Sequence, residues 1–162
     1  MHEQARGSLV AKGGNMRRLI PAALFCALLS ATARGDEPIG LGVVDDAIPK
    51  SLTGTPGNAE AGKKVFLTRT LGNCLACHQV TALKSEEFHG EFGPSLDGVA
   101  GRYNTAQLRL IVADPKRIFA DTVMPAFYKN DGLNRVRPEF VGKPVLTAAQ
   151  VEDVVAFLET LK

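Results

Sequence analysis

The stretch Cys74-Leu75-Ala76-Cys77-His78 has the pattern Cys-x-x-Cys-His and is the most informative part of the sequence. This is the attachment pattern of c-type haem, in which both thiols add to the vinyl groups of the porphyrin. The adjacent histidine becomes a ligand of the iron. A redox dithiol would need a β-α-β context and a zinc site would need a second ligand pair. The sequence offers neither, so it predicts one covalent haem c on Cys74 and Cys77, with His78 on the iron.

The N-terminal residues have the features of a secretory signal peptide. Met16-Arg17-Arg18 is a positively charged start, residues 19–30 are apolar, and Ala31-Thr32-Ala33 is a small-residue cleavage site. We therefore expect residues 1–15 to lie upstream of the true start and residues 16–35 to be the signal peptide. The apolar run is too short for a transmembrane helix. The alternative is an uncleaved anchor, but we expect a periplasmic protein with no stable membrane anchor after cleavage.

Removal of that segment changes the inventory of cysteines and charges. Cys26 lies in the apolar run, so the mature chain keeps only the two cysteines that the haem would take. The whole chain has a net charge of +2. From Asp36 onward there are 14 lysines and arginines against 16 aspartates and glutamates, a net charge of −2. No basic patch favours nucleic acid as a partner.

Glycine and proline divide the mature chain into a lead-in and one domain. Residues 36–57 contain four glycines and three prolines, which interrupt any helix and predict an irregular N-terminal segment. Its apolar residues could pack on a partner's surface, or the segment could be an ordered or frayed tail of its own domain. Residues 58–162 are then a single domain.

Several helices are expected in that domain. Asn58 is a suitable N-cap for a helix that runs to about Thr70, with Gly62 and Phe66 one turn apart on one face. Because glycine weakens a helix, Gly62 suggests that another helix approaches closely.

Two further helices follow. Asn104 or Thr105 could begin one that ends before Asp114-Pro115. Thr147 and Gln150 form a capping box that opens a last amphipathic helix over residues 148–161. No convincing strand alternation is present.

The second axial ligand of the iron is the next question. A methionine opposite histidine is common in electron-transfer haems and raises their reduction potential. The mature chain has one methionine, Met124, and Pro125 fixes the backbone beside it. His89 is the competing ligand, although its polar loop favours a solvated surface side chain. Met124 is the predicted ligand.

Taken together, the motifs resemble those of a class I cytochrome c. They are Gly62 and Phe66, Cys74 to His78, the stretch from Gly93 to Arg102, Met124-Pro125 and the last helix. The resemblance covers residues 58–162 and implies an all-α class I cytochrome c fold around one haem, with the first and last helices crossing. It also implies that the Pro94 carbonyl accepts a hydrogen bond from His78 and that Arg102 lies near a haem propionate. Tyr103 is a weaker candidate for the haem surroundings.

A narrower resemblance concerns residues 90–103, 110–116, 121–128 and 133–146, which are similar to segments of the SoxX family. SoxX is the monohaem subunit of the SoxAX complex. The resemblance implies a heterodimer with a SoxA-type cytochrome that oxidatively couples thiosulfate to a cysteine of a SoxYZ-type carrier protein, an L-cysteine S-thiosulfotransferase activity. This chain would pass the electrons to a soluble acceptor. No catalytic residue is expected in this chain.

Two other functions remain open at this point. The chain could be a free-standing electron carrier, which would have a charged docking rim, whereas a permanent subunit would have an apolar patch. A ligand sensor or peroxidase would need an open iron position, which Met124 argues against.

Overall fold

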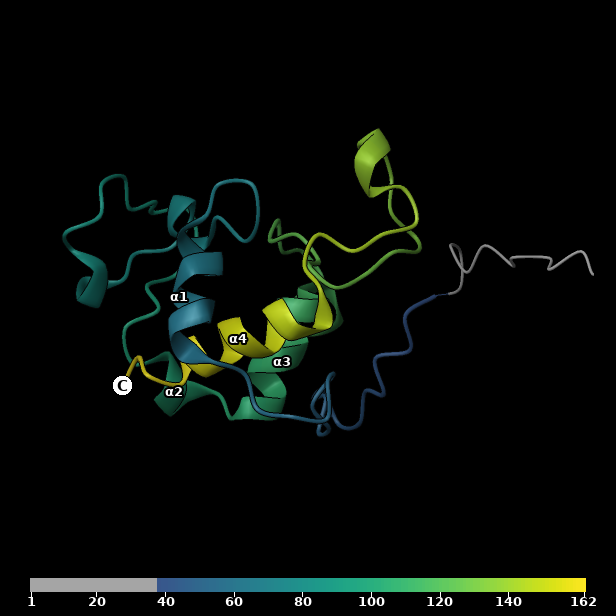
Figure 1. Cartoon of the computed structure of the whole chain (residues 1–162), viewed down its shortest axis with the longest axis horizontal. Helices are drawn as coiled ribbons and strands as arrows, with labels where there is room; N and C mark the ends of the chain where they lie inside the picture. Colours follow the sequence, from purple (N-terminus) through teal and green to yellow (C-terminus); the bar gives the residue numbers. More distant parts are fainter. Residues whose placement is uncertain (1–37) are drawn as a thin grey trace, which may run out of the picture. The chain divides into compact units, whose positions relative to one another are not determined.

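The computed structural model describes residues 38–162, which fold into four α-helices joined by loops and short 3₁₀ turns. The helices are α1 (Ala59–Leu67), α2 (Val99–Arg102), α3 (Thr105–Ala113) and α4 (Ala148–Leu158) (Figure 1). Within that range no β-strand forms, and an isolated β-bridge pairs Val44 with Ala47. The predicted all-α class is confirmed. The predicted signal peptide lies outside the described residues.

The helices begin where their capping residues predict. The side chain of Asn58 accepts a hydrogen bond from the backbone of Ala61 at the start of α1. Asn104, rather than Thr105, is the N-cap of α3 and forms a capping box with Gln107. Thr147 forms the expected box at the start of α4. Local side chains therefore satisfy N–H groups that the first turn of each helix leaves unpaired.

Two helix ends differ from the prediction. Helix α1 ends at Leu67 and not near Thr70, because Thr68 turns into an extended conformation and its hydroxyl donates to the carbonyl of Lys64. Helix α4 ends at Leu158, and the chain continues as a turn to the buried Leu161. Helix α2 was not expected, because its four residues are too few to show a periodic pattern.

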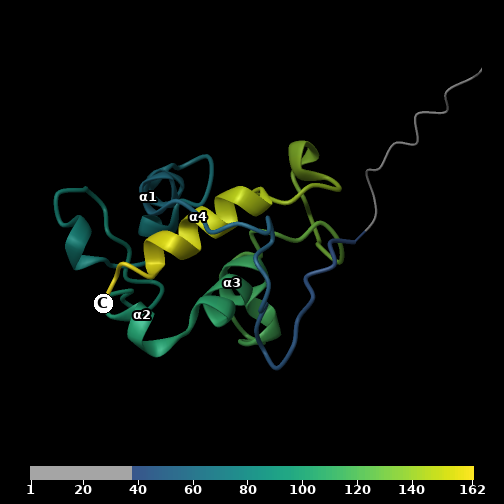
Figure 2. The same ribbon diagram turned by 60° about the horizontal axis from the view of Figure 1, so that its bottom comes forward.

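Helices α1 and α4 cross in close contact (Figures 1 and 2). A side chain on Gly62 would overlap the backbone of Asp153 in α4, so only glycine allows this approach. One turn later the rings of Phe66 and Phe157 meet edge to face, with centroids 5.3 Å apart. The contact predicted for the first and last helices is confirmed, and it gives the domain its central core.

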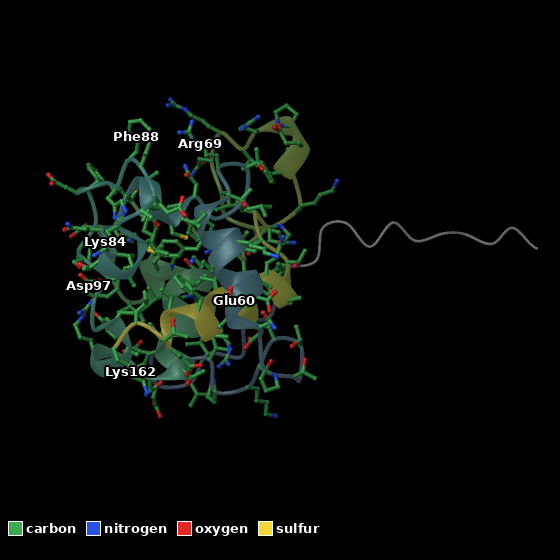
Figure 3. The ribbon with its side chains drawn as sticks, turned by 60° about the vertical axis from the view of Figure 1, so that its left-hand side comes forward. Glu60, Arg69, Lys84, Phe88, Asp97 and Lys162 are labelled. Atoms are coloured by element: carbon green, nitrogen blue, oxygen red, sulfur yellow. The ribbon has the colours of Figure 1, made fainter. Side chains whose placement is uncertain are left out.

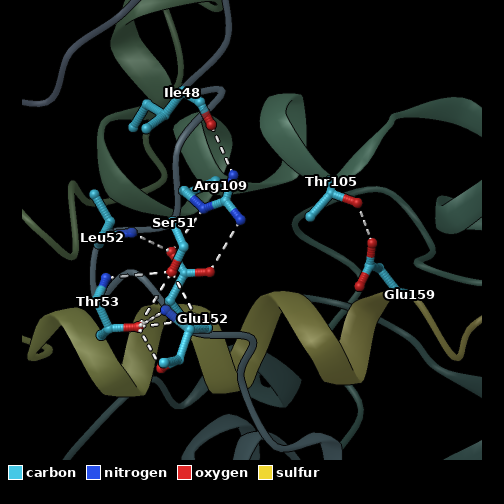
Figure 4. Close-up of polar contacts among 9 residues, drawn as sticks. Ile48, Ser51, Leu52, Thr53, Thr105, Arg109, Glu152 and Glu159 are labelled. Carbon is cyan, nitrogen blue, oxygen red and sulfur yellow. Dashed lines mark hydrogen bonds and ion pairs between the residues drawn. The ribbon is translucent and has the colours of Figure 1, made fainter.

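A buried ion pair attaches the lead-in to the helices (Figure 4). The Nε and Nη2 atoms of Arg109 in α3 donate to the two carboxylate oxygens of Glu152 in α4, at 2.6 and 3.0 Å. The Nη1 atom of Arg109 also donates to the carbonyl of Ile48, at 2.7 Å. The backbone N–H of Leu52 donates to Glu152 at 2.8 Å. These four bonds join two helices and an irregular segment at a point closed to solvent.

The apolar residues of the lead-in pack on their own domain. Ile48 is buried against Leu110 and Ala113 of α3, and Leu41 and Val43 pack at the edge of the same cluster. Residues 38–57 are therefore an ordered part of their own domain, which was one of the two possibilities for this segment. None of the helices in residues 38–162 is long and apolar enough to cross a membrane.

Candidate haem site

The Cys-x-x-Cys-His stretch forms a tight 3₁₀ turn over Cys74–Ala76. The carbonyl of Cys74 accepts from the backbone N–H groups of both Cys77 and His78, at 3.1 and 3.0 Å. Asn73 enters the turn with φ +47°, a left-handed conformation that asparagine tolerates. The turn therefore holds both cysteines and the histidine next to one another, as attachment to one porphyrin requires.

The two thiols differ in their surroundings. Cys74 is partly buried and Cys77 is exposed. Burial raises the pKa of the Cys74 thiol to about 12, so it is protonated at neutral pH before haem attachment. The 3₁₀ turn places both cysteines beside His78, which fits a pair of thioether attachment points on one haem.

The imidazole of His78 is oriented by the loop beside it. Its Nδ1 atom lies 2.7 Å from the carbonyl oxygen of Pro94. Because a carbonyl only accepts, Nδ1 carries the proton and Nε2 keeps its lone pair for a metal. A side chain at Gly93 would overlap the His78 ring, so glycine is needed where the backbone passes it. This is the hydrogen bond that the class I motif implies, and the residues fit a haem iron.

The loop that carries Pro94 is fastened to the chain after His78. The carboxylate of Asp97 accepts from the backbone N–H and the hydroxyl of Thr81, at 2.8 and 2.6 Å. The hydrogen bond from the Thr81 hydroxyl has the largest effect on the pKa of Asp97, which it lowers. The bond from the backbone N–H of Thr81 lowers this pKa further. The backbone of Leu96 also donates to Gln79 at 3.0 Å. Sequence reasoning missed Asp97 and Thr81, because two loop residues sixteen positions apart carry no periodic signal.

Arg102 braces the same loop from the other side. Its Nη1 donates to the carbonyl of Asp97 at 2.6 Å, and its Nη2 donates to the carbonyl of Ser95 at 2.8 Å. Arg102 is exposed. Its contact with a haem propionate remains a prediction. Tyr103 is half-buried against the core, next to Arg102 in the chain, and its place in the haem surroundings also remains a prediction.

Met124 lies half-buried at the edge of the core, in the loop that follows α3. Its backbone N–H donates to the hydroxyl of Thr122 at 3.1 Å, and Lys116 donates to the carbonyl of Thr122 at 2.5 Å. Phe127, three residues on, is buried and bonds to Val112 of α3. The thioether is thus carried by a loop held at both ends.

His89 is neither a free ligand nor a solvated side chain. One ring nitrogen, Nδ1, accepts from the backbone of Val80 at 3.3 Å, and the other, Nε2, donates to the carbonyl of Leu83 at 3.0 Å. Both nitrogens therefore hold the loop that follows the haem motif. The expectation of a solvated surface histidine is wrong, because the side chain folds back onto its own loop.

Comparison with known proteins agrees with this geometry. The profile of the cytochrome c family matches residues 59–162. A search of curated proteins found no match. A solved structure described as SoxXA from P. pantotrophus contains a chain with 52% sequence identity and a TM-score of 0.69. The match covers 74% of this chain and 92% of that one. This chain therefore belongs to the cytochrome c family, within which it is a SoxX-type electron-transfer subunit that binds haem c.

Proposed function

We propose that this chain is the electron-transfer subunit of a periplasmic SoxAX-type heterodimer that oxidatively couples thiosulfate to a carrier-protein cysteine. The observation that carries the proposal is its 52% identity over 92% of a chain in a SoxXA structure. The family match also indicates an extracytoplasmic protein, and the signal-like residues 16–35 support the periplasm as its compartment.

The coupling reaction requires a route for electrons. Joining the terminal sulfur of thiosulfate to a carrier-protein thiol forms one sulfur–sulfur bond and releases the thiol proton and two electrons. These electrons leave one at a time. In our proposal the SoxA-type subunit holds the sulfur substrates, and this chain takes the electrons from it and delivers them to a soluble acceptor. The carrier is a SoxYZ-type protein that acts through the complex.

The residues of this chain have separate roles in that task. Cys74 and Cys77 would hold the haem covalently, and Nε2 of His78 and the sulfur of Met124 would ligate its iron. The haem supplies a one-electron carrier when it is bound. The Pro94 carbonyl orients His78 and would make the imidazole a stronger donor to the metal. Arg102 and Tyr103 would complete the surroundings of the porphyrin.

No sulfur chemistry is assigned to this chain itself. Both cysteines of the described part are in the attachment turn, and as thioethers they have no thiol left to form a persulfide or a mixed disulfide. With His78 and Met124 both on the iron, sulfur would also find no open metal position. The chain is therefore proposed to transfer electrons only.

Affinity purification of the tagged chain from its native periplasm tests the assignment. We expect a second c-type cytochrome in a one-to-one ratio that survives gel filtration. A chain that elutes as a haem-loaded monomer, with no cytochrome partner, would instead indicate a free-standing electron carrier.

A further inference from the structure

Two phenylalanines stand out from the loop that covers the haem attachment turn. We call residues 84–93 the phenylalanine loop. Phe88 is 77% exposed and Phe92 is 75% exposed, the largest values among the exposed large hydrophobic residues of the described chain. Figure 3 shows the Phe88 ring at the outer end of the loop. Water contact with aromatic rings is unfavourable, so two highly exposed phenylalanines on one loop are typical of a surface that another molecule covers.

The loop lies directly on the attachment turn. The backbone N–H of Gly90 donates to the carbonyl of Leu75 at 2.9 Å, and that of Gly93 donates to Cys77 at 2.7 Å. A side chain at Gly90 would overlap Ala76 and Cys77, so the two segments are in backbone contact. Cys77 is itself exposed. The loop that carries the phenylalanines therefore borders the haem attachment turn.

The loop is also held rigidly while its two rings point outward. His89 is bonded through both ring nitrogens to Val80 and Leu83, and Gly90 and Gly93 are pinned as described. Phe88 precedes His89 with φ +63°, a left-handed conformation that is rare for a bulky residue. Strain of this kind persists only where surrounding contacts impose it, and it is concentrated at functional positions. Two exposed aromatic side chains on a loop that is already held in place are suited to binding a partner.

We propose that the phenylalanine loop is the docking surface for the partner cytochrome subunit and the point of electron entry. The inference rests on the proposed function and adds the location of the interface. Transient docking to a small acceptor favours a charged rim, whereas a permanent interface has an apolar, aromatic centre. Glu86, Glu87 and Glu91 are exposed neighbours of the two phenylalanines in the chain and outnumber the one basic residue of the loop, Lys84. The facing surface of the partner should therefore be an apolar pocket bordered by basic side chains.

The test uses haem-loaded chain and haem-loaded SoxA-type cytochrome from the same cell, with association measured by calorimetry. The double variant Phe88→Ser/Phe92→Ser should bind about 100-fold more weakly or worse, as removal of two central aromatic anchors does. Val141→Ser, at an apolar position that is 63% exposed on another loop, is the matched control and should change binding less than about threefold. The visible spectrum should stay the same in all three proteins.

Two results would overturn the docking surface. One is a double variant that binds the partner within threefold of the unaltered chain. The other is normal partner binding by the double variant with slower electron delivery to a soluble acceptor, which would make the loop the exit and not the entry. Failure of the unaltered chain to bind the SoxA-type cytochrome would contradict the proposed function itself. This result differs from a failure of the docking surface, in which the unaltered chain and the double variant bind equally well.

Discussion

At the scale of single residues, the two proposed ligands of the iron, His78 and Met124, would set the chemistry. His78 is fixed by Pro94, at 2.7 Å, on a loop that is bonded to the segment after the haem motif. Met124 is fixed through its neighbours Thr122 and Phe127. The histidine side is therefore anchored by direct contact with the ring, whereas the methionine side depends on the placement of its loop.

The first prediction concerns that methionine. Met124→Ala should leave the haem attached but remove the thioether from the iron. We expect the reduction potential to fall by on the order of 100 mV, within the wide range that axial ligands control. The opened position should bind added imidazole. A redox titration and an imidazole titration measure both effects, and an unchanged spectrum and potential would mean that Met124 is not the ligand.

The second prediction concerns the pH dependence of the proximal loop. The pKa of Asp97 is lowered in the folded state by its bonds to Thr81. Its ionised form therefore adds stability that is complete above the unfolded-state pKa of about 3.9 and is lost as the pH falls through the lowered folded-state value. Asp97→Asn should lower the free energy of unfolding at pH 7, and the difference from the unaltered protein should shrink as the pH falls below about 4.

Urea unfolding at a series of pH values from 3 to 7 measures that difference. Asp131→Asn, at an exposed position, is the control and should leave the curve unaltered. A constant difference between Asp97→Asn and the unaltered protein across the series would contradict the role assigned to the Asp97–Thr81 contact.

At the scale of elements, the crossing of α1 and α4 organises the domain. Gly62→Ala would place a methyl group in the backbone of Asp153, which cannot move without separating the helices. We expect a loss of about 2 kcal/mol or more in the free energy of unfolding, despite the better helix propensity of alanine. Thermal or urea unfolding of the haem-loaded protein measures it.

Gly101→Ala is the matched control for that substitution. Gly101 is also a helical glycine, in α2, but a side chain there would meet open space. Alanine should therefore be neutral or stabilising by up to about 1 kcal/mol. Equal losses at Gly62 and Gly101 would show that helix propensity, and not the crossing, determines the effect.

The elements also show how far the sequence determines the structure. The starts of helices α1 and α4 could be predicted from Asn58, Thr147 and Gln150, because capping depends on residues that are neighbours in the sequence. The Cys-x-x-Cys-His turn was equally local. Helix ends, helix α2 and the bonds of His89 were missed or misjudged. They depend on how loops fold back in space, which no local pattern encodes.

At the scale of the whole molecule, the Arg109–Glu152 pair joins the lead-in to the helical domain. Glu152→Gln would leave the Arg109 charge buried without its counterion, and we expect a loss of about 3–5 kcal/mol in the free energy of unfolding. Glu139→Gln, in the exposed pair with Arg137, is the control and should cost at most about 1 kcal/mol. Similar losses at both positions would contradict the role of the buried pair.

The same pair should govern protection of the lead-in. Because Ile48 and Leu52 are bonded to Arg109 and Glu152, the Glu152→Gln variant should expose residues 48–52 to proteolysis sooner than the haem motif. Limited digestion followed by mass spectrometry would detect the order of cleavage. Cleavage of residues 48–52 and of the haem motif at the same rate would mean that the lead-in does not unfold separately from the rest of the domain.

Above all, we propose that this chain receives electrons released by thiosulfate coupling on a partner subunit. The most direct measurement follows the reduction of its haem by absorbance in a mixture of the chain, the SoxA-type cytochrome, a SoxYZ-type carrier and thiosulfate. We predict reduction only in the complete mixture, and none when the carrier thiol is alkylated beforehand. Equal reduction by thiosulfate without the partner, or no reduction in the complete mixture, would contradict the account.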